Sequence, residues 1–165
     1  MNLLALDLSL TASGWARALD DHGTIRTPKK GAERLGVILD EVAALAYGDQ
    51  PVDVVLIEGY AYAAHNRAHQ VGELGGVIRL ELWRAGVPFV EIAPPVLKKY
   101  ATGKGNSPKP ELRMALYKRT GLDVSDDNQV DAVWLVAAGF ELAGAPIIDV
   151  PQAQRDALGK VEWPT

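Results

Sequence analysis

Two short apolar runs, each of strand length and each leading into an acid, constrain this chain most. The first, LLAL at residues 3–6, leads directly into Asp7. The second covers Val52–Ile57, ends in four consecutive apolar residues and leads into Glu58. Strands with such runs are typical of the covered centre of an α/β sheet. Because a carboxylate taken from water costs several kcal/mol unless it is paired, both acids need an explanation.

Length and composition favour one domain over residues 1–165, with a tail over about 144–165 that covers the surface. At 165 residues and 48% apolar content, the chain can bury a proper core. No apolar stretch approaches the roughly 20 residues of a membrane span, and we expect no signal peptide. The absence of cysteine excludes disulfides and thiol catalysis. These features favour a soluble cytoplasmic protein.

The periodicity predicts a three-stranded antiparallel meander followed by alternating helices and strands. We therefore expect an α/β fold whose five-stranded mixed sheet combines this meander with parallel strands and is flanked by helices. Gly48 and Gly121 are expected to close helices, and Ser125 or Asp126 to cap the last one. The expected strands are 2–8, 15–20, 24–27, 52–57 and 86–92; the expected helices are 32–47, 71–83, one opening at 94–95, 110–120 and 126–142.

Basic residues concentrate between positions 98 and 119, although the net charge of the chain is −4. Seven of the 17 Lys and Arg residues fall in this stretch, opposed by Glu111 alone. Acids gather just beyond it, between positions 123 and 131. This segregation predicts a surface for an anionic partner beside a site for cations, and a solvated helix face is the alternative.

Asp131, at the start of an apolar helical stretch, is a third acid at the end of an element. Alone, each acid has an ordinary explanation as a turn residue, a solvated strand end or a helix N-terminal charge. Together they suggest a cation site, because neighbouring parallel strands lie only about 4.8 Å apart and their carboxylates would repel. Such oxygen ligands suit Mg²⁺ or Mn²⁺, and two such ions can activate water against a phosphodiester.

Four stretches in order resemble the RuvC-type Holliday-junction resolvases of the RNase H-like nuclease superfamily. They are LALDLSLTASGWA, VVLIEGYAY, the run from GELGGVIRLELW to GNSPKPEL, and DDNQVDAVWLVAA, which together cover residues 3 to about 140. The resemblance implies an RNase H-like fold. It also implies a metal-dependent endonuclease that resolves Holliday junctions and other branched DNA by paired symmetric nicks, leaving 5′-phosphate and 3′-hydroxyl ends.

By matched position, the resemblance makes Asp7, Glu58 and Asp131 metal ligands. The family has a further acid, or a histidine, one helical turn before the last ligand, where this chain has Asn128. Asn128 offers a neutral carbonyl oxygen, and Asp127 beside it offers a charge, so either residue is expected to complete the site. Mg²⁺ is the implied cofactor, with two ions per site and Mn²⁺ as a substitute.

The resemblance also places basic and aromatic residues near the DNA. Lys98 and Lys109 match lysines near the scissile phosphate, where Lys109 would stabilise charge in the transition state. Tyr60 and Tyr62 match an aromatic that stacks on bases, and core or surface tyrosines are the alternative. The expected DNA-binding residues are Lys98, Lys99, Lys104, Lys109, Arg113, Tyr60 and Tyr62.

The implied partners are a four-way DNA junction, a second copy of the chain, and branch-migration proteins. Two symmetric nicks require a two-fold homodimer, with the helix around Gly72–Trp83 as the expected interface. The protein would act in a bacterial cytoplasm, or in a host cytoplasm if a phage encodes it.

Three other functions deserve comparison. The opening motif also resembles the actin-like ATPases and sugar kinases, but those need two such domains and this chain has one. An RNase H-like nuclease acting on RNA, hybrid or flap DNA would share the acids without requiring the basic loop. A non-catalytic DNA-binding module would fit if Asn128 marks a degraded site, although three acids remain.

Overall fold

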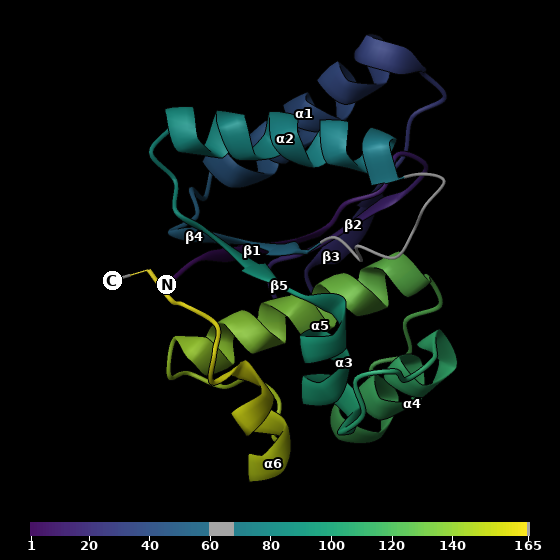
Figure 1. The fold of residues 1–165 in the computed structure, drawn as a ribbon, viewed down its shortest axis with the longest axis vertical. Coiled ribbons are helices and arrows are strands. Elements are labelled where there is room, and N and C mark those ends of the chain that lie inside the picture. The colour runs from purple at the N-terminus through teal and green to yellow at the C-terminus, as the bar shows by residue number, and fades with distance from the viewer. Residues whose placement is uncertain (60–67, 165) are drawn as a thin grey trace.

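A five-stranded sheet lies between two layers of helices in the computed structural model, which describes residues 1–59 and 68–164 (Figure 1). Helices α1 and α2 cover one face, and α3, α4, α5 and α6 lie on the other. The elements are β1 (Leu3–Asp7), β2 (Ser13–Ala16), β3 (His22–Ile25), α1 (Gly31–Tyr47), β4 (Val54–Glu58), α2 (Ala68–Arg84), β5 (Phe89–Ile92), α3 (Pro94–Thr102), α4 (Lys109–Thr120), α5 (Asp127–Leu142), α6 (Gln152–Arg155) and a 3₁₀ turn at Asp156–Leu158.

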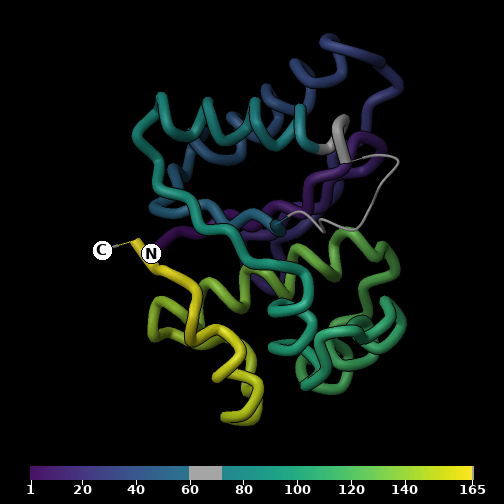
Figure 2. The backbone as a smooth tube through the Cα atoms, in the orientation of Figure 1, coloured from purple at the N-terminus to yellow at the C-terminus, as the bar shows by residue number. Residues whose placement is uncertain are grey.

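The strand order is β3-β2-β1-β4-β5, which confirms the expected mixed sheet. β1, β2 and β3 pair antiparallel, whereas β4 pairs parallel with both β1 and β5. Figure 2 traces α5 across the face opposite α1 and α2, and α5 contacts all of β1 to β4.

Strand alternation divides the core into two apolar clusters, one on each face of the sheet. Leu3 and Ala5 of β1 pack in the cluster that contains the buried side of α5. Leu4 and Leu6 pack with α1 and α2 on the other face. The fully buried Trp134 joins α5 to α4, since its indole N–H donates to the Leu112 carbonyl at 3.1 Å. Helix α5 is thereby held firmly against the sheet.

The helices follow the sequence prediction closely. Helix α1 ends at Gly48, α3 begins with its two prolines in the first turn, and α4 ends at Gly121 in the left-handed conformation. Asp126 is the N-cap of α5. Helix α2 begins before the expected position 71. These agreements arise because caps and prolines act within a few residues of where they stand.

The second and third strands were predicted too late in the chain. β2 covers Ser13–Ala16 rather than 15–20, and β3 covers His22–Ile25 rather than 24–27. The connecting turn includes Arg17, whose N–H donates to the Asp21 carbonyl. Pairing with β1 explains the shift, because Asp7 lies opposite Gly14 and the strand must extend back to meet it. The fifth strand is likewise confined to Phe89–Ile92.

The C-terminal segment does more than cover the surface. Ile148, Val150 and Leu158 are buried and belong to the cluster on the α5 face. Gln154 of the short helix α6 is also buried and accepts from Arg119. The expectation of a surface tail over 144–165 is therefore wrong for these residues, which complete the core.

Candidate metal centre and its surroundings

The sheet brings Asp7 and Glu58 to one edge and onto one face. β1 and β4 are parallel and pair Leu6 with Ile57, so the next residues on both strands are the two acids. Alternation points Asp7 to the same side as Leu3 and Ala5, which is the side of α5. The same rule points Glu58 toward α5, since Val54 and Leu56 pack in that cluster.

Asp131, in the second turn of α5, completes a cluster of three carboxyl groups. One oxygen from each of Asp7, Glu58 and Asp131 lies within 4.8 Å of the others. The Asp131 side chain is only 12% exposed. Of the described residues, this is the one group of three or more such side chains placed to hold a metal ion.

Gly14 of β2 allows α5 to come this close. A Cβ atom at Gly14 would lie 2.0 Å from the backbone oxygen of Asn128, far inside van der Waals contact. The first turn of α5 therefore crosses β2 where only a glycine leaves room for its backbone. Since Asp131 follows one turn later, this contact sets how far its carboxyl group reaches toward Asp7.

The pKa values of the three clustered carboxyl groups are raised. Burial raises the pKa of Glu58 to about 9, and the charges of Asp7 and Asp131 add to the rise. Burial and the charge of Asp7 raise the pKa of Asp131 to about 6. Burial also raises the pKa of Asp7, although its hydrogen bond with Glu58 opposes the rise. Hard oxygen donors with too much negative charge in a partly buried site suit a divalent cation.

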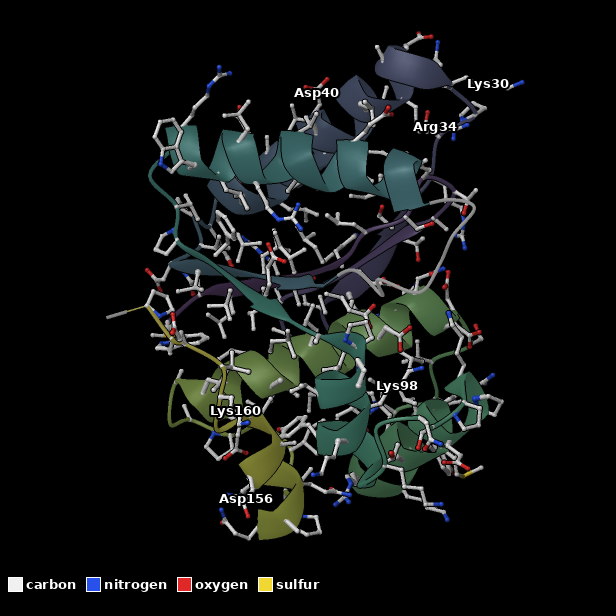
Figure 3. The ribbon with its side chains drawn as sticks, viewed as in Figure 1. Lys30, Arg34, Asp40, Lys98, Asp156 and Lys160 are labelled. Atoms are coloured by element: carbon white, nitrogen blue, oxygen red, sulfur yellow. The ribbon has the colours of Figure 1, made fainter. Side chains whose placement is uncertain are left out.

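Two lysines face this cluster from the basic part of the chain. Lys109, the first residue of α4, places its Nζ 3.7 Å from Asp131 Oδ2 while remaining 51% exposed. Lys98 of α3 lies close enough to lower the pKa of both Glu58 and Asp131, although burial outweighs it (Figure 3). The structure thus places both predicted lysines beside the acids.

A network of polar side chains fixes the start of α5, and the sequence analysis did not identify it. Thr24 of β3 donates to Asp126 Oδ2 at 3.0 Å, and Arg26 forms an ion pair with the same oxygen at 2.6 Å. Gln129 donates to Thr24 and contacts His22 Nδ1 at 2.8 Å. No sequence spacing signals these contacts, because the partners stand about 100 positions apart.

Asp127 and Asn128, the two alternatives for a fourth ligand, have different surroundings. Asp127 is exposed in the first turn of α5. Asn128 is half-buried, and both its backbone N–H and its side-chain amide donate to Asp126 Oδ1 at 3.0 Å. Although burial opposes it, hydrogen bonds from Thr24, Asn128 and Arg26 hold the pKa of Asp126 below its usual value. Asp126 stays ionised and orients the Asn128 amide.

The other predicted DNA-binding residues differ in their surroundings. Lys99 and Lys104 are exposed at the end of α3 and in the following loop. Arg113, on α4, forms an ion pair with Asp123 at 2.7 Å. Tyr60 and Tyr62 lie outside the described residues.

Comparison with known proteins identifies the family. No family model matches the chain. The chain is 30% identical to the crossover junction endodeoxyribonuclease RuvC of Sorangium cellulosum, over 96% of this chain and 100% of that protein. It is 28% identical to the protein of the same name from Gloeobacter violaceus, over 96% of this chain and 95% of that one.

Solved structures agree on the fold. The structure of Thermus thermophilus RuvC superposes with a TM-score of 0.70 at 22% identity, covering 90% of this chain and 100% of that one. The same protein in complex with a Holliday junction substrate gives 0.70 at 23% identity, covering 90% and 99%. The fold and the carboxylate site define an RNase H-like nuclease. The chain belongs to the RuvC family of crossover junction endodeoxyribonucleases.

The helices carry no sign of a membrane-spanning segment: over residues 1–59 and 68–164, none is both long and apolar enough.

Proposed function

We propose that this protein is a metal-dependent endonuclease that resolves Holliday junctions and other branched DNA by paired symmetric nicks. The observation that carries the proposal is the convergence of Asp7, Glu58 and Asp131 within 4.8 Å at one sheet edge, with Lys109 beside them. Relatives over nearly the whole chain bear the name crossover junction endodeoxyribonuclease, and a structural neighbour was solved with a Holliday junction. We propose that residues 1–165 act as one domain.

The three carboxylates would hold two Mg²⁺ ions, for which Mn²⁺ could substitute. When held there, the ions would supply activation of a water molecule and stabilisation of the leaving oxygen of a phosphodiester, and cleavage would leave 5′-phosphate and 3′-hydroxyl ends. The raised pKa of Glu58, about 9, supports this role, since the charge of Lys98 does not offset the burial of Glu58 and the charges of Asp7 and Asp131. Lys109 would donate to the scissile phosphate, from its position 3.7 Å from Asp131.

Asn128 is our proposed fourth ligand, and Asp127 would then raise the negative potential without binding the ion. Asp126 accepts from the Asn128 amide nitrogen, which leaves the carbonyl oxygen without a hydrogen bond from any described residue. A neutral ligand suits a cluster that is already overcharged. Calorimetric titration with Mn²⁺ tests the choice: Asn128→Ala should weaken binding about tenfold, and Asp127→Asn should change it less. The reverse order would assign the ligand to Asp127.

Two copies of the chain would act together on one junction in a bacterial cytoplasm, or in a host cytoplasm if a phage encodes the protein. Helix α2 is the proposed interface, since Trp83 is 72% exposed and Leu80 46% exposed on its outer side. Large exposed apolar side chains on one helix face are typical of an interaction surface. Branch-migration proteins are a further proposed partner of the dimer.

Mapping cleavage on a synthetic four-way junction tests the proposal directly. With Mg²⁺ or Mn²⁺, the wild-type protein should make symmetric nicks in two opposed strands and should cut linear duplex far more slowly. Asp7→Asn should abolish cleavage and retain junction binding, because it removes a charged ligand without touching the basic residues. Wild-type cleavage by Asp7→Asn would overturn the metal site.

The panel of substrates separates this function from its nearest alternatives. Equal or faster cutting of an RNA–DNA hybrid or a flap would indicate an RNase H-like nuclease with another substrate. Junction binding without any cleavage in either metal would indicate a binding module.

A further inference from the structure

A second group of basic side chains lies outside the stretch 98–119. The segment from position 26 to 34 holds four basic residues and a single acid, Glu33, in a chain whose net charge is −4. It runs from the end of β3 into the first turn of α1. We call it the β3–α1 basic surface; its members are Arg26, Lys29, Lys30 and Arg34.

The register of the sheet places the end of β3, where this surface begins, on the same edge as the carboxyl cluster. Asp7 lies opposite Gly14, and Gly14 lies opposite Thr24, so the end of β3 is two strand spacings, about 10 Å, from Asp7. Arg26 follows β3 directly and reaches Asp126 at the start of α5. Figure 3 shows Lys30 and Arg34 at the start of α1, in the layer that covers the face of the sheet opposite α5.

Three of the four basic residues of this surface are exposed, and Arg34 is half-buried. Lys30 is exposed and forms no ion pair with any residue of 1–59 or 68–164. Arg34 Nε donates to the Lys29 carbonyl at 2.7 Å, which ties α1 to the preceding loop. Lys29 contacts Glu33 at 2.6 Å but remains 48% exposed, and Arg26 remains 61% exposed. Glu33 and Asp126 pair with Lys29 and Arg26, so the positive excess of the surface rests on Lys30 and Arg34.

The carboxyl cluster thus lies between two positive regions. Lys98 and Lys109 approach it from the α3 and α4 side. The β3–α1 basic surface begins beyond β2 on the other side, at Arg26, and continues into the layer of α1. A polyanion whose cleaved phosphate sits at the cluster would extend past it in both directions. A duplex carries a charge for about every 1.7 Å of its axis, so it would meet both regions at once.

We propose that the β3–α1 basic surface binds the phosphates of a duplex DNA arm away from the cleaved bond. This inference rests on the proposed function, because it takes the DNA held at the carboxyl cluster as its starting point. The surface would contribute to affinity and not to the reaction, because it begins two strands away from Asp7. Each phosphate contact contributes about 0.9 to the slope of log affinity against log salt.

Lys30→Glu tests the surface, with Lys160→Glu as its matched control. Both lysines are exposed, and Figure 3 shows Lys160 on the far side of the molecule, by the C-terminal segment. Anisotropy titrations with a four-way junction, in EDTA to prevent cleavage, would be run over a range of salt concentrations. Lys30→Glu should raise the dissociation constant about tenfold and lower the salt slope by about one, whereas Lys160→Glu should change neither.

Arm length supplies the second measurement. Shortening the junction arms stepwise should weaken wild-type binding to the level of Lys30→Glu, and should affect Lys30→Glu much less. At saturating junction with Mg²⁺, both variants should cleave at the wild-type rate. Thermal melting of both variants checks that neither is unfolded.

The outcomes separate the two proposals. If the wild type neither binds nor cuts the junction, the proposed function fails, and this inference fails with it. If the wild type does both and Lys30→Glu matches Lys160→Glu at every arm length, only the inference is overturned. The surface would then be available to an acidic partner of another kind.

Discussion

The two faces of the sheet are built from the same strands, but at the same edge one face carries acidic residues and the other carries apolar residues. On the α5 side, the alternating positions of β1 and β4 run from the apolar core into Asp7 and Glu58. On the α1 and α2 side, the neighbouring positions Leu6 and Ile57 remain fully apolar. One face ends in charges that need a partner, and the other in a closed core. In this fold, strand alternation and register therefore determine where the carboxyl cluster lies.

Alanine substitutions of one glycine on each face should give the largest difference in cleavage rate and stability. Gly14→Ala places a Cβ 2.0 Å from the Asn128 carbonyl, so α5 must move away from β2. We expect cleavage to fall about 100-fold, since a displacement of about 1 Å has that effect on a positioned group. Unfolding free energy should fall by about 1–3 kcal/mol, as for other overpacked sites.

Gly36→Ala, on α1 across the sheet, is the matched control. A Cβ there meets no atom within 4 Å, and alanine favours helix, so stability should rise by about 0.5–1 kcal/mol with cleavage unchanged. Junction cleavage rates and urea denaturation measure both variants. Normal cleavage by Gly14→Ala would show that the close approach of α5 does not set the site.

The pH dependence of the unfolding free energy should also differ between acids on the two faces of the sheet. Burial and the charges of Asp7 and Asp131 raise the pKa of Glu58 from 4.5 to about 9, so folding takes up a proton between these values. Without divalent cations, the contribution of Glu58 to stability is therefore lost as pH rises from about 4.5 to about 9. Asp131, with its pKa raised to about 6, adds to this loss at the acid end.

Glu58→Gln should gain stability over the wild type as pH rises, when both are unfolded in EDTA by urea between pH 5 and 9. Glu41→Gln, an exposed acid on α1, should follow the wild-type curve. Adding Mg²⁺ should reduce the wild-type loss, because the cation favours the ionised carboxyl groups. A constant difference between Glu58→Gln and the wild type would contradict the proton uptake.

Thr24→Val tests the smallest expected effect, that of the polar network at the start of α5. The change removes the hydroxyl that donates to Asp126 and accepts from Gln129. Unfolding free energy should fall by about 1–2 kcal/mol, and Mn²⁺ affinity should fall severalfold, because the start of α5 loses a support.

Thr120→Val is the control for the lost hydroxyl. It removes a hydrogen bond to Leu116 at the end of α4, away from the carboxyl cluster. A comparable loss of stability without a change in Mn²⁺ affinity is expected. If both variants bind Mn²⁺ equally well, the network stabilises α5 without positioning Asp131.

Elements whose signals are local could be predicted from the sequence. The apolar runs before Asp7 and Glu58 predicted two central strands, and the caps and prolines of α3, α4 and α5 predicted their ends. Adjacent parallel strands ending in acids also predicted the carboxyl cluster. These inferences held because alternation, capping and strand spacing depend on neighbours in the chain or on one pairing.

Strand bounds, burial and contacts that depend on residues distant in the sequence could be seen in the folded structure but not in the sequence. The bounds of β2 followed from its register with β1, and the burial of Ile148 and Val150 from a core completed by the last segment. The contact of Gly14 with Asn128 and the support of Asp126 by Thr24 join residues about 100 positions apart. Such contacts leave no periodic trace in a single sequence, because each is made once, by packing α5 across the sheet.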